Sequence, residues 1–116
     1  MVIASVNREP ENVKKYSVAM EFFTEEENDT LWDAHIKACY ATAEPLATAG
    51  GYDYSDSSMI KKVNKEIPVV LVNRSKPPPA EAWTLFRKLS GALMLSLKLR
   101  ARVDGHSIYR KIILKA

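Results

Sequence analysis

The sequence predicts an all-α fold, a compact bundle of about five helices in which residues 1–116 form a single helical domain. Three observations lead to this prediction. The chain holds only 4 glycines, its apolar residues recur at spacings of three and four, and its prolines stand where helices begin or bend. With 47% hydrophobic and 27% charged residues, the composition is that of a folded domain and excludes a disordered tail. No apolar run reaches the roughly 18 residues of a membrane-spanning helix, and residues 1–6 lack the positive region of a secretory signal.

The first helix is expected to begin near Pro10, because proline costs little in a first helical turn. Glu9 and Glu11 flank it at the positive end of the helix dipole, which favours carboxylates. Apolar residues then follow at helical spacing and are predicted to face the core: Val13, Tyr16, Met20 and Phe23.

The second helix is expected to start at Thr24, which stands three residues before Glu27 in a capping-box relation. Six carboxylates and no cation occur in residues 21–33, and the dipole at a helix start explains them locally. One side of this helix carries small residues that let another helix approach closely: Ala34, Ala38 and Ala41, beside Leu31. Pro45 and the glycines at 50–51 are predicted to mark its end and the following turn.

Residues 52–75 allow two interpretations. The β-branched run at 67–72 would be a short strand by propensity alone. Helical spacing links Ile60, Val63, Ile67 and Leu71, and the serines of residues 55–58 supply candidate N-caps. We therefore predict a helix that is kinked at Pro68.

The prolines at 77–79 are predicted to form a rigid elbow, because two of them force an extended path and Pro79 is suited to begin a helix. The helix that follows is expected to be the buried centre of the bundle. Its apolar face consists of Ala82, Leu85, Phe86, Leu89, Leu93 and Leu97. Asp104 and Gly105 should end it. A last short helix is expected from Ser107, with Ile108, Ile112 and Ile113 as its apolar residues.

We predict no catalytic, cofactor-binding or metal-binding residue in this chain. Neither a phosphate-binding loop nor a dinucleotide fingerprint is present, and kinase-type H-R-D and D-F-G elements are missing. His35 and Cys39 are four residues apart, as paired ligands often are, but zinc needs three or four ligands. Ser57 and Ser58 lack a positioned base, so the sequence offers no activated nucleophile.

The last thirty residues form a basic segment that contains the candidate docking surface. From Arg87 onward there are eight cations against one carboxylate, Asp104, a net charge of +7. Such a surface could attract nucleic acid or anionic lipid, although a solvated helix face is the plainer interpretation. The candidate docking residues are Trp83, Arg87, Lys88, Lys98, Arg100 and Arg102. An aromatic beside cations also suits base stacking, but Trp83 is more simply explained by packing under the proline elbow.

The order of residues in the segment 67–103 resembles the carboxy-terminal end of the aarF/UbiB family of atypical kinase-like proteins, called ADCK proteins in animals. The matching elements are Ile67-Pro68-Val69, Pro77-Pro78-Pro79, Glu81, Trp83, Leu85, Arg87-Lys88, Gly91 and Lys98-Leu99. The two preceding helices are similar to the family as well, so the resemblance covers roughly residues 10–112. It favours the helical interpretation of residues 67–72.

The resemblance implies the helical end of a kinase-like C-lobe, linked to ubiquinone biosynthesis and located on the matrix side of the mitochondrial inner membrane. The family's catalytic elements precede the matched region, so ATP and magnesium are expected only in full-length members. This chain alone is therefore expected to be inactive. Its expected partner is the remainder of a kinase-like fold or a protein assembly, and a membrane surface is a further candidate. Nucleic acid is less favoured, and no small-molecule substrate is seen. The alternative is a stand-alone structural or scaffold subunit of a mitochondrial assembly, whose basic C-terminal third binds RNA, membrane or protein.

Overall fold

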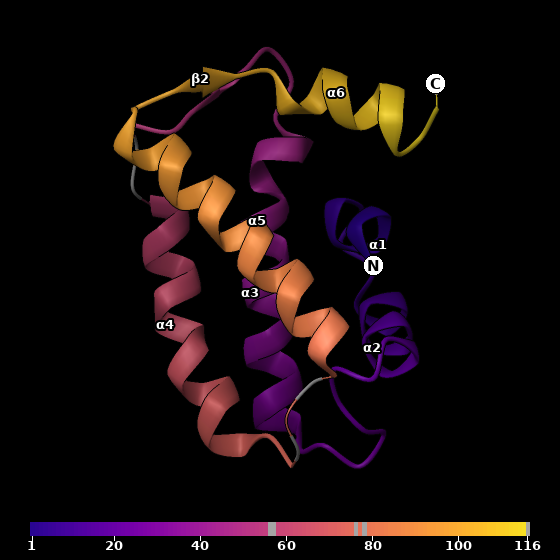
Figure 1. The fold of residues 1–116 in the computed structure, drawn as a ribbon. Coiled ribbons are helices and arrows are strands. Elements are labelled where there is room, and N and C mark those ends of the chain that lie inside the picture. Colours follow the sequence, from indigo (N-terminus) through magenta and orange to yellow (C-terminus); the bar gives the residue numbers. More distant parts are fainter. Residues whose placement is uncertain (56–57, 76, 78, 116) are drawn as a thin grey trace.

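The computed structural model describes residues 1–55, 58–75, 77 and 79–115, except for the side chain of residue 86. The described residues contain six helices and two very short strands (Figure 1). The helices are α1 (Val2–Val6), α2 (Pro10–Ala19), α3 (Asp29–Ala47), α4 (Ser58–Asn73), α5 (Ala80–Lys98) and α6 (Gly105–Ile112). The strands are β1 (Tyr52–Asp53) and β2 (Arg102–Val103). The predicted all-α fold is confirmed.

The first two helices pack against one side of α3. The prediction that a helix begins at Pro10 is confirmed, and Pro10 occupies the first helical turn of α2. Val13 and Phe23 are buried as predicted, but Tyr16 is exposed, because this side of α2 faces solvent. The short helix α1 precedes α2 and contacts α3, and it was not predicted.

Helix α3 is the centre of the fold. It contacts α1, α2, α4 and α6, and its small residues Ala34, Ala41 and Ala43 are buried where these neighbours approach. The helix starts later than predicted, because the side chain of Asn28, not that of Thr24, accepts the N–H of Leu31 at 2.8 Å. It also ends later, because Pro45 lies inside the helix, which continues to Ala47.

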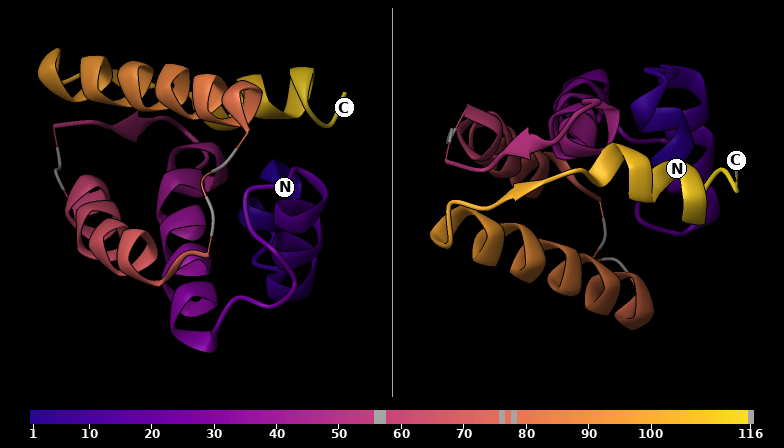
Figure 2. Two further views of the ribbon diagram at one scale, coloured as in Figure 1. Left: turned by 60° about the horizontal axis from the view of Figure 1, so that its bottom comes forward. Right: turned by 90° about the horizontal axis from the view of Figure 1, so that it is seen from above.

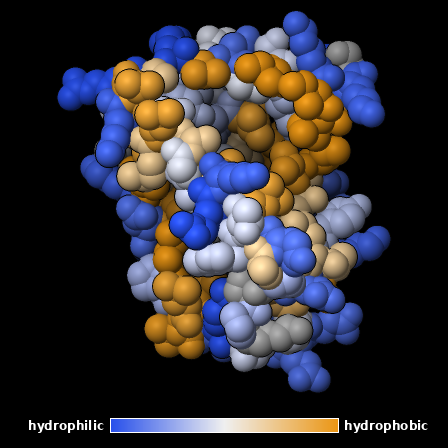
Figure 3. Space-filling view, viewed as in Figure 1, coloured by the Kyte–Doolittle hydropathy of each residue, from blue (hydrophilic) through white to orange (hydrophobic). Residues whose placement is uncertain are grey.

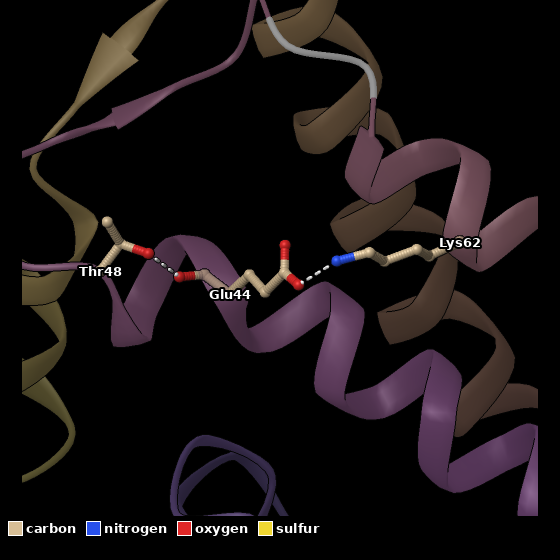
Figure 4. A network of polar contacts seen from close by, with 3 residues as sticks. All are labelled: Glu44, Thr48 and Lys62. Carbon is tan, nitrogen blue, oxygen red and sulfur yellow. Dashed lines mark hydrogen bonds and ion pairs between the residues drawn. The ribbon is translucent and has the colours of Figure 1, made fainter.

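Helix α4 runs alongside α3, and together they make the most extensive helix pair of the fold. The prediction of a helix is confirmed, since residues 67–72 belong to α4 and Pro68 lies within it. A salt bridge joins the two helices, with Lys62 Nζ 2.7 Å from Glu44 Oε1 (Figure 4). Thr48 donates its hydroxyl to the Glu44 carbonyl at 2.8 Å and so satisfies a carbonyl at the end of α3.

Helix α5 is not the buried centre that its sequence predicts. It crosses in front of α3 as a separate layer (Figures 1 and 2), and Ala82 is its only buried residue among the described side chains. Four leucines of α5 and its C-cap are at least half exposed: Leu85, Leu89, Leu95 and Leu99. The prediction failed because α5 has apolar residues on nearly every side. A pattern that wide does not tell which side faces the core.

The two strands link the segment between α3 and α4 to the segment between α5 and α6. They pair antiparallel, Tyr52 with Val103 and Asp53 with Arg102. Gly50 and Gly51 precede β1 with φ of 85° and 102°, a left-handed conformation that favours glycine. Asp104 does not end α5 as predicted; its side chain accepts the N–H of Ser107 at 3.1 Å and caps α6.

Candidate docking surface

A hydrogen-bond cluster, which we name the Glu27 clamp, joins the loop between α2 and α3 to the residues that follow α4. The buried carboxylate of Glu27 accepts the backbone N–H and the hydroxyl of Thr24 at 3.0 and 2.9 Å. It also accepts the N–H and the hydroxyl of Ser75 at 3.0 and 2.6 Å. Glu27, in the loop between α2 and α3, thus binds the segment that follows α4.

Burial alone would raise the pKa of Glu27, but the hydrogen bonds from Ser75 and Thr24 outweigh it and keep the pKa below its usual value. The carboxylate is therefore charged at neutral pH. In this form both of its oxygens can accept hydrogen bonds from the four donors. Thr24 and Glu27 are hydrogen-bonded as the capping-box prediction requires. Their hydrogen bonds close a turn in the loop before α3, however, and do not cap the helix.

Arg74 adds a second contact between the same two loops. Its guanidinium lies over the ring of Phe23, 5.2 Å from the centroid, and donates to the carbonyl of Phe22 at 3.1 Å. The amide of Asn28 donates to the side chain of Asn73 at 3.1 Å. Contacts therefore join residues 22–28 to residues 73–75 along both segments.

The predicted proline elbow falls partly outside the described residues, because position 78 is not among them, but the start of α5 is described. Pro79 is the N-cap, with φ of −59° and ψ of 155°, and its carbonyl accepts the N–H of Trp83 at 3.0 Å. At the other end, Arg100 has a φ of 49°, and the N–H of Tyr54 binds the Ala101 carbonyl at 2.8 Å. The segment after α5 is thus tied to the residue that follows β1.

The six candidate docking residues divide between two sides of α5 and the segment after it. At about 100° per residue, Trp83, Arg87 and Lys98 share one side, which we name the cationic edge. Lys88 lies on another side, among exposed leucines. Arg100 follows the helix, and Arg102 lies in β2, where its side chain is beside Gly51. All six are exposed, so the structure does not gather them into one cluster.

The sequence-based docking surface missed the exposed apolar residues. Val72 at the end of α4 is 83% exposed, and Leu99 after α5 is 68% exposed. On α6, three isoleucines are open to solvent: Ile108, Ile112 and Ile113. Figure 3 shows hydrophobic surface along α4 and over α6. The sequence does show that these helices carry more apolar residues than one buried face needs. Only the packing of the helices shows which of these residues stay exposed.

His35 and Cys39, considered above as paired ligands, lie side by side on α3. Cys39 Sγ is 3.6 Å from His35 Nε2, and no group of three or more metal-ligating side chains occurs in the described part of the chain. Burial raises the pKa of the Cys39 thiol to about 11, so it stays protonated and unreactive. Ser17, which is fully buried, lies 2.8 Å from the same His35 nitrogen. Ser57, also considered as a nucleophile, lies outside the described residues.

His35 is expected to make the fold sensitive to acid. Burial, with a smaller contribution from the Arg74 charge, lowers its pKa from 6.5 to about 4. The unfolded chain therefore binds a proton between pH 6.5 and 4 that the folded chain does not, and stability falls as the pH drops through this window. By pH 5 the loss is about 2 kcal/mol.

Urea unfolding of the wild type and of His35→Gln at pH 7 and pH 5 measures this loss. The variant should lack most of the additional decrease, because glutamine does not titrate. Equal decreases in both proteins would contradict the assignment.

The chain is similar to kinase-like proteins along almost its whole length. It is 37% identical over 111 residues, 94% of this chain, to "Atypical kinase COQ8, mitochondrial" of Schizosaccharomyces pombe. It is 31% identical over 110 residues to "Atypical kinase COQ8B, mitochondrial" of Rattus norvegicus and 30% identical over 112 residues to "Atypical kinase coq-8, mitochondrial" of Caenorhabditis elegans, 95% and 97% of this chain. The chain belongs to the aarF/UbiB family. The resemblance noted from residues 67–103 is confirmed.

The family relatives are much longer than this chain. The matches cover 18%, 21% and 15% of the three relatives, so the chain spans about one fifth of their length. The similarity is consistent with the C-terminal region of the UbiB family. No family model matches the chain.

Proposed function

We propose that this chain is a non-catalytic C-terminal helical subdomain of an atypical kinase-like or ATPase-like protein, and that it acts by packing and docking. Its partner is the remainder of a kinase-like fold. We further propose that it serves ubiquinone biosynthesis on the matrix side of the mitochondrial inner membrane. The mitochondrial names of the UbiB relatives support the mitochondrial part of this proposal.

One observation carries the proposal: the helices leave apolar surface uncovered. Exposed large apolar residues occur on α4, α5 and α6, whereas single domains rarely leave extended apolar patches open to water. None of the described helices is long and apolar enough to span a bilayer. The surface of a folded protein partner would cover these exposed apolar side chains. Its acidic groups would also pair with the cations that lie beside them.

The cationic edge of α5 supports a directed contact. The side chains of Arg87 and Lys98 are exposed, and Trp83 beside them is 47% exposed. Aromatic and arginine residues are enriched where protein interfaces form. We assign this edge to an acidic surface of the kinase-like remainder.

ATP and magnesium are proposed to bind only to longer members of the family. A thermal-shift experiment on residues 1–116 tests this, because a ligand of the folded state raises the melting temperature. We expect no shift with ATP and magnesium. A reproducible increase would show a nucleotide site in this chain and would end the proposal of a non-catalytic role.

A chimera tests the docking role. This chain replaces the matching 111 residues of the S. pombe relative, and Arg87→Glu with Lys98→Glu is introduced. The double variant should lower the melting temperature of the chimera but leave that of the isolated chain unchanged. Lys61→Glu on α4, also an exposed lysine, is the control and should change neither. If the isolated chain instead binds RNA or anionic vesicles through Arg87 and Lys98 and the chimera is unaffected, the scaffold alternative is correct.

A further inference from the structure

A row of residues along α5 and its C-cap, exposed except for the half-buried Ser96, is symmetric about Ala92. The row, which we name the α5 stripe, consists of Leu85, Lys88, Leu89, Ala92, Leu95, Ser96 and Leu99. At about 100° per residue these positions share one broad side of the helix, well apart from the cationic edge. Its leucines are at least half exposed, with Leu95 at 58%.

The symmetry has a geometric consequence for two antiparallel copies of α5. Leu85 and Leu99 each stand seven residues from Ala92, so they fall opposite each other when one copy is turned end for end. Lys88 falls opposite Ser96 in the same way, which avoids placing like charges together. The stripe is therefore complementary to itself, which is what a two-fold interface requires.

The centre of the stripe permits a close approach. Ala92 is exposed, and the neighbouring Gly91 has open space around the position of a Cβ atom, with no heavy atom within 4 Å. Packed helices lie about 8–10 Å apart, and small residues at the crossing point favour the shorter distances. The leucines on both sides of Ala92 then pack across the crossing.

The charges at the two ends of α5 also match in this arrangement. Glu81 lies in the first turn, on the line of the stripe, whereas Lys98 and the exposed Arg100 lie at the opposite end. No salt bridge between described residues uses any of these three side chains. An antiparallel pair brings Glu81 of each copy towards Arg100 of the other.

We propose that the α5 stripe is a self-association surface, through which two copies of this chain form an antiparallel, two-fold symmetric dimer about Ala92. This goes beyond the docking role, which keeps the exposed apolar residues of α4 and α6 and the cationic edge, whereas the dimer uses the α5 stripe. Burial of the leucines drives the association, and the end charges set its direction.

Analytical ultracentrifugation over a concentration series tests the dimer. We expect the mass to rise towards twice 13.0 kDa. Leu95→Glu should weaken dimerisation more than about tenfold, because it buries an unpaired charge in the interface. Leu71→Glu on α4 is the matched control, since Leu71 is also 58% exposed, and it should dimerise like the wild type. A monomer at all concentrations, or equal effects of the two variants, would overturn the proposal; the first result would leave the stripe to the kinase-like remainder.

Two further variants test the register. In a Cys39→Ser background, Ala92→Cys should form an intermolecular disulfide on oxidation, because position 92 meets itself at the two-fold axis. Thr84→Cys, exposed on the same helix, lies opposite position 100 and should not. Glu81→Arg and Arg100→Glu should each weaken the dimer, and the double variant should restore it. Equal cross-linking of both cysteines, or no restoration by the double variant, would rule out this arrangement.

Discussion

Phe23→Ala is expected to lower the free energy of unfolding by about 4 kcal/mol, because it removes a buried ring at the junction of three segments. Phe23 is 4% exposed. Its ring meets Trp32 edge-on with 5.7 Å between centroids and meets His35 at 4.7 Å, while Arg74 covers its face. Truncation leaves a cavity among side chains that are fixed by their own hydrogen bonds and packing.

Urea unfolding followed by tryptophan fluorescence measures this loss. Phe22→Ala is the matched control, because Phe22 is only partly buried and packs at the edge of the same cluster. Phe22→Ala should lower the free energy of unfolding clearly less than Phe23→Ala does. Equal losses for the two variants would show that Phe23 has no special place in the core.

Glu27→Gln is expected to destabilise the fold by about 3 kcal/mol at pH 7, because it leaves four donors in part-buried hydrogen bonds without a charged acceptor. The Glu27 carboxylate accepts four hydrogen bonds, two from Thr24 and two from Ser75. Glutamine offers a single acceptor oxygen, and its amide group donates towards groups that are themselves donors. Glu26→Gln, at an exposed neighbouring position, should change stability very little.

The pH dependence separates the charge of Glu27 from its packing. Because its folded pKa lies below the ordinary 4.5, it stabilises the fold above pH 4.5, and this contribution disappears as the pH falls through the folded pKa. The difference in unfolding free energy between the wild type and Glu27→Gln should therefore shrink in acid. A difference that stays constant down to pH 3 would show that packing alone is responsible.

Sequence reasoning located most helices because their local signals agree with the fold. Pro10 opens α2, and the spacing of Ile60, Val63, Ile67 and Leu71 correctly outweighed the strand propensity of residues 67–72. A spacing of three and four extends over the whole of α4. Strand propensity concerned only six residues, and Pro68 within them argues against a central strand.

The same reasoning could not rank the helices by burial. Helix α3 became the centre because alanines let neighbours approach it from several sides, and α5, with more leucines, stayed outside. Apolar content measures how much surface a helix offers, whereas burial depends on which neighbours reach it. The Glu27 clamp was hidden for a related reason, since Ser75 lies 48 residues from Glu27 along the chain.

That separation has a consequence for the order in which the protein assembles. The contacts of Glu27 with Ser75 and of Phe22 with Arg74 close the chain into one large loop. This loop contains α3 and α4. Closing a loop of this length costs conformational entropy, but it brings together α3 and α4, the most extensive helix pair of the fold. We therefore expect α5, whose described side chains are almost all exposed or half-buried, to join this pair late and to open early in local fluctuations.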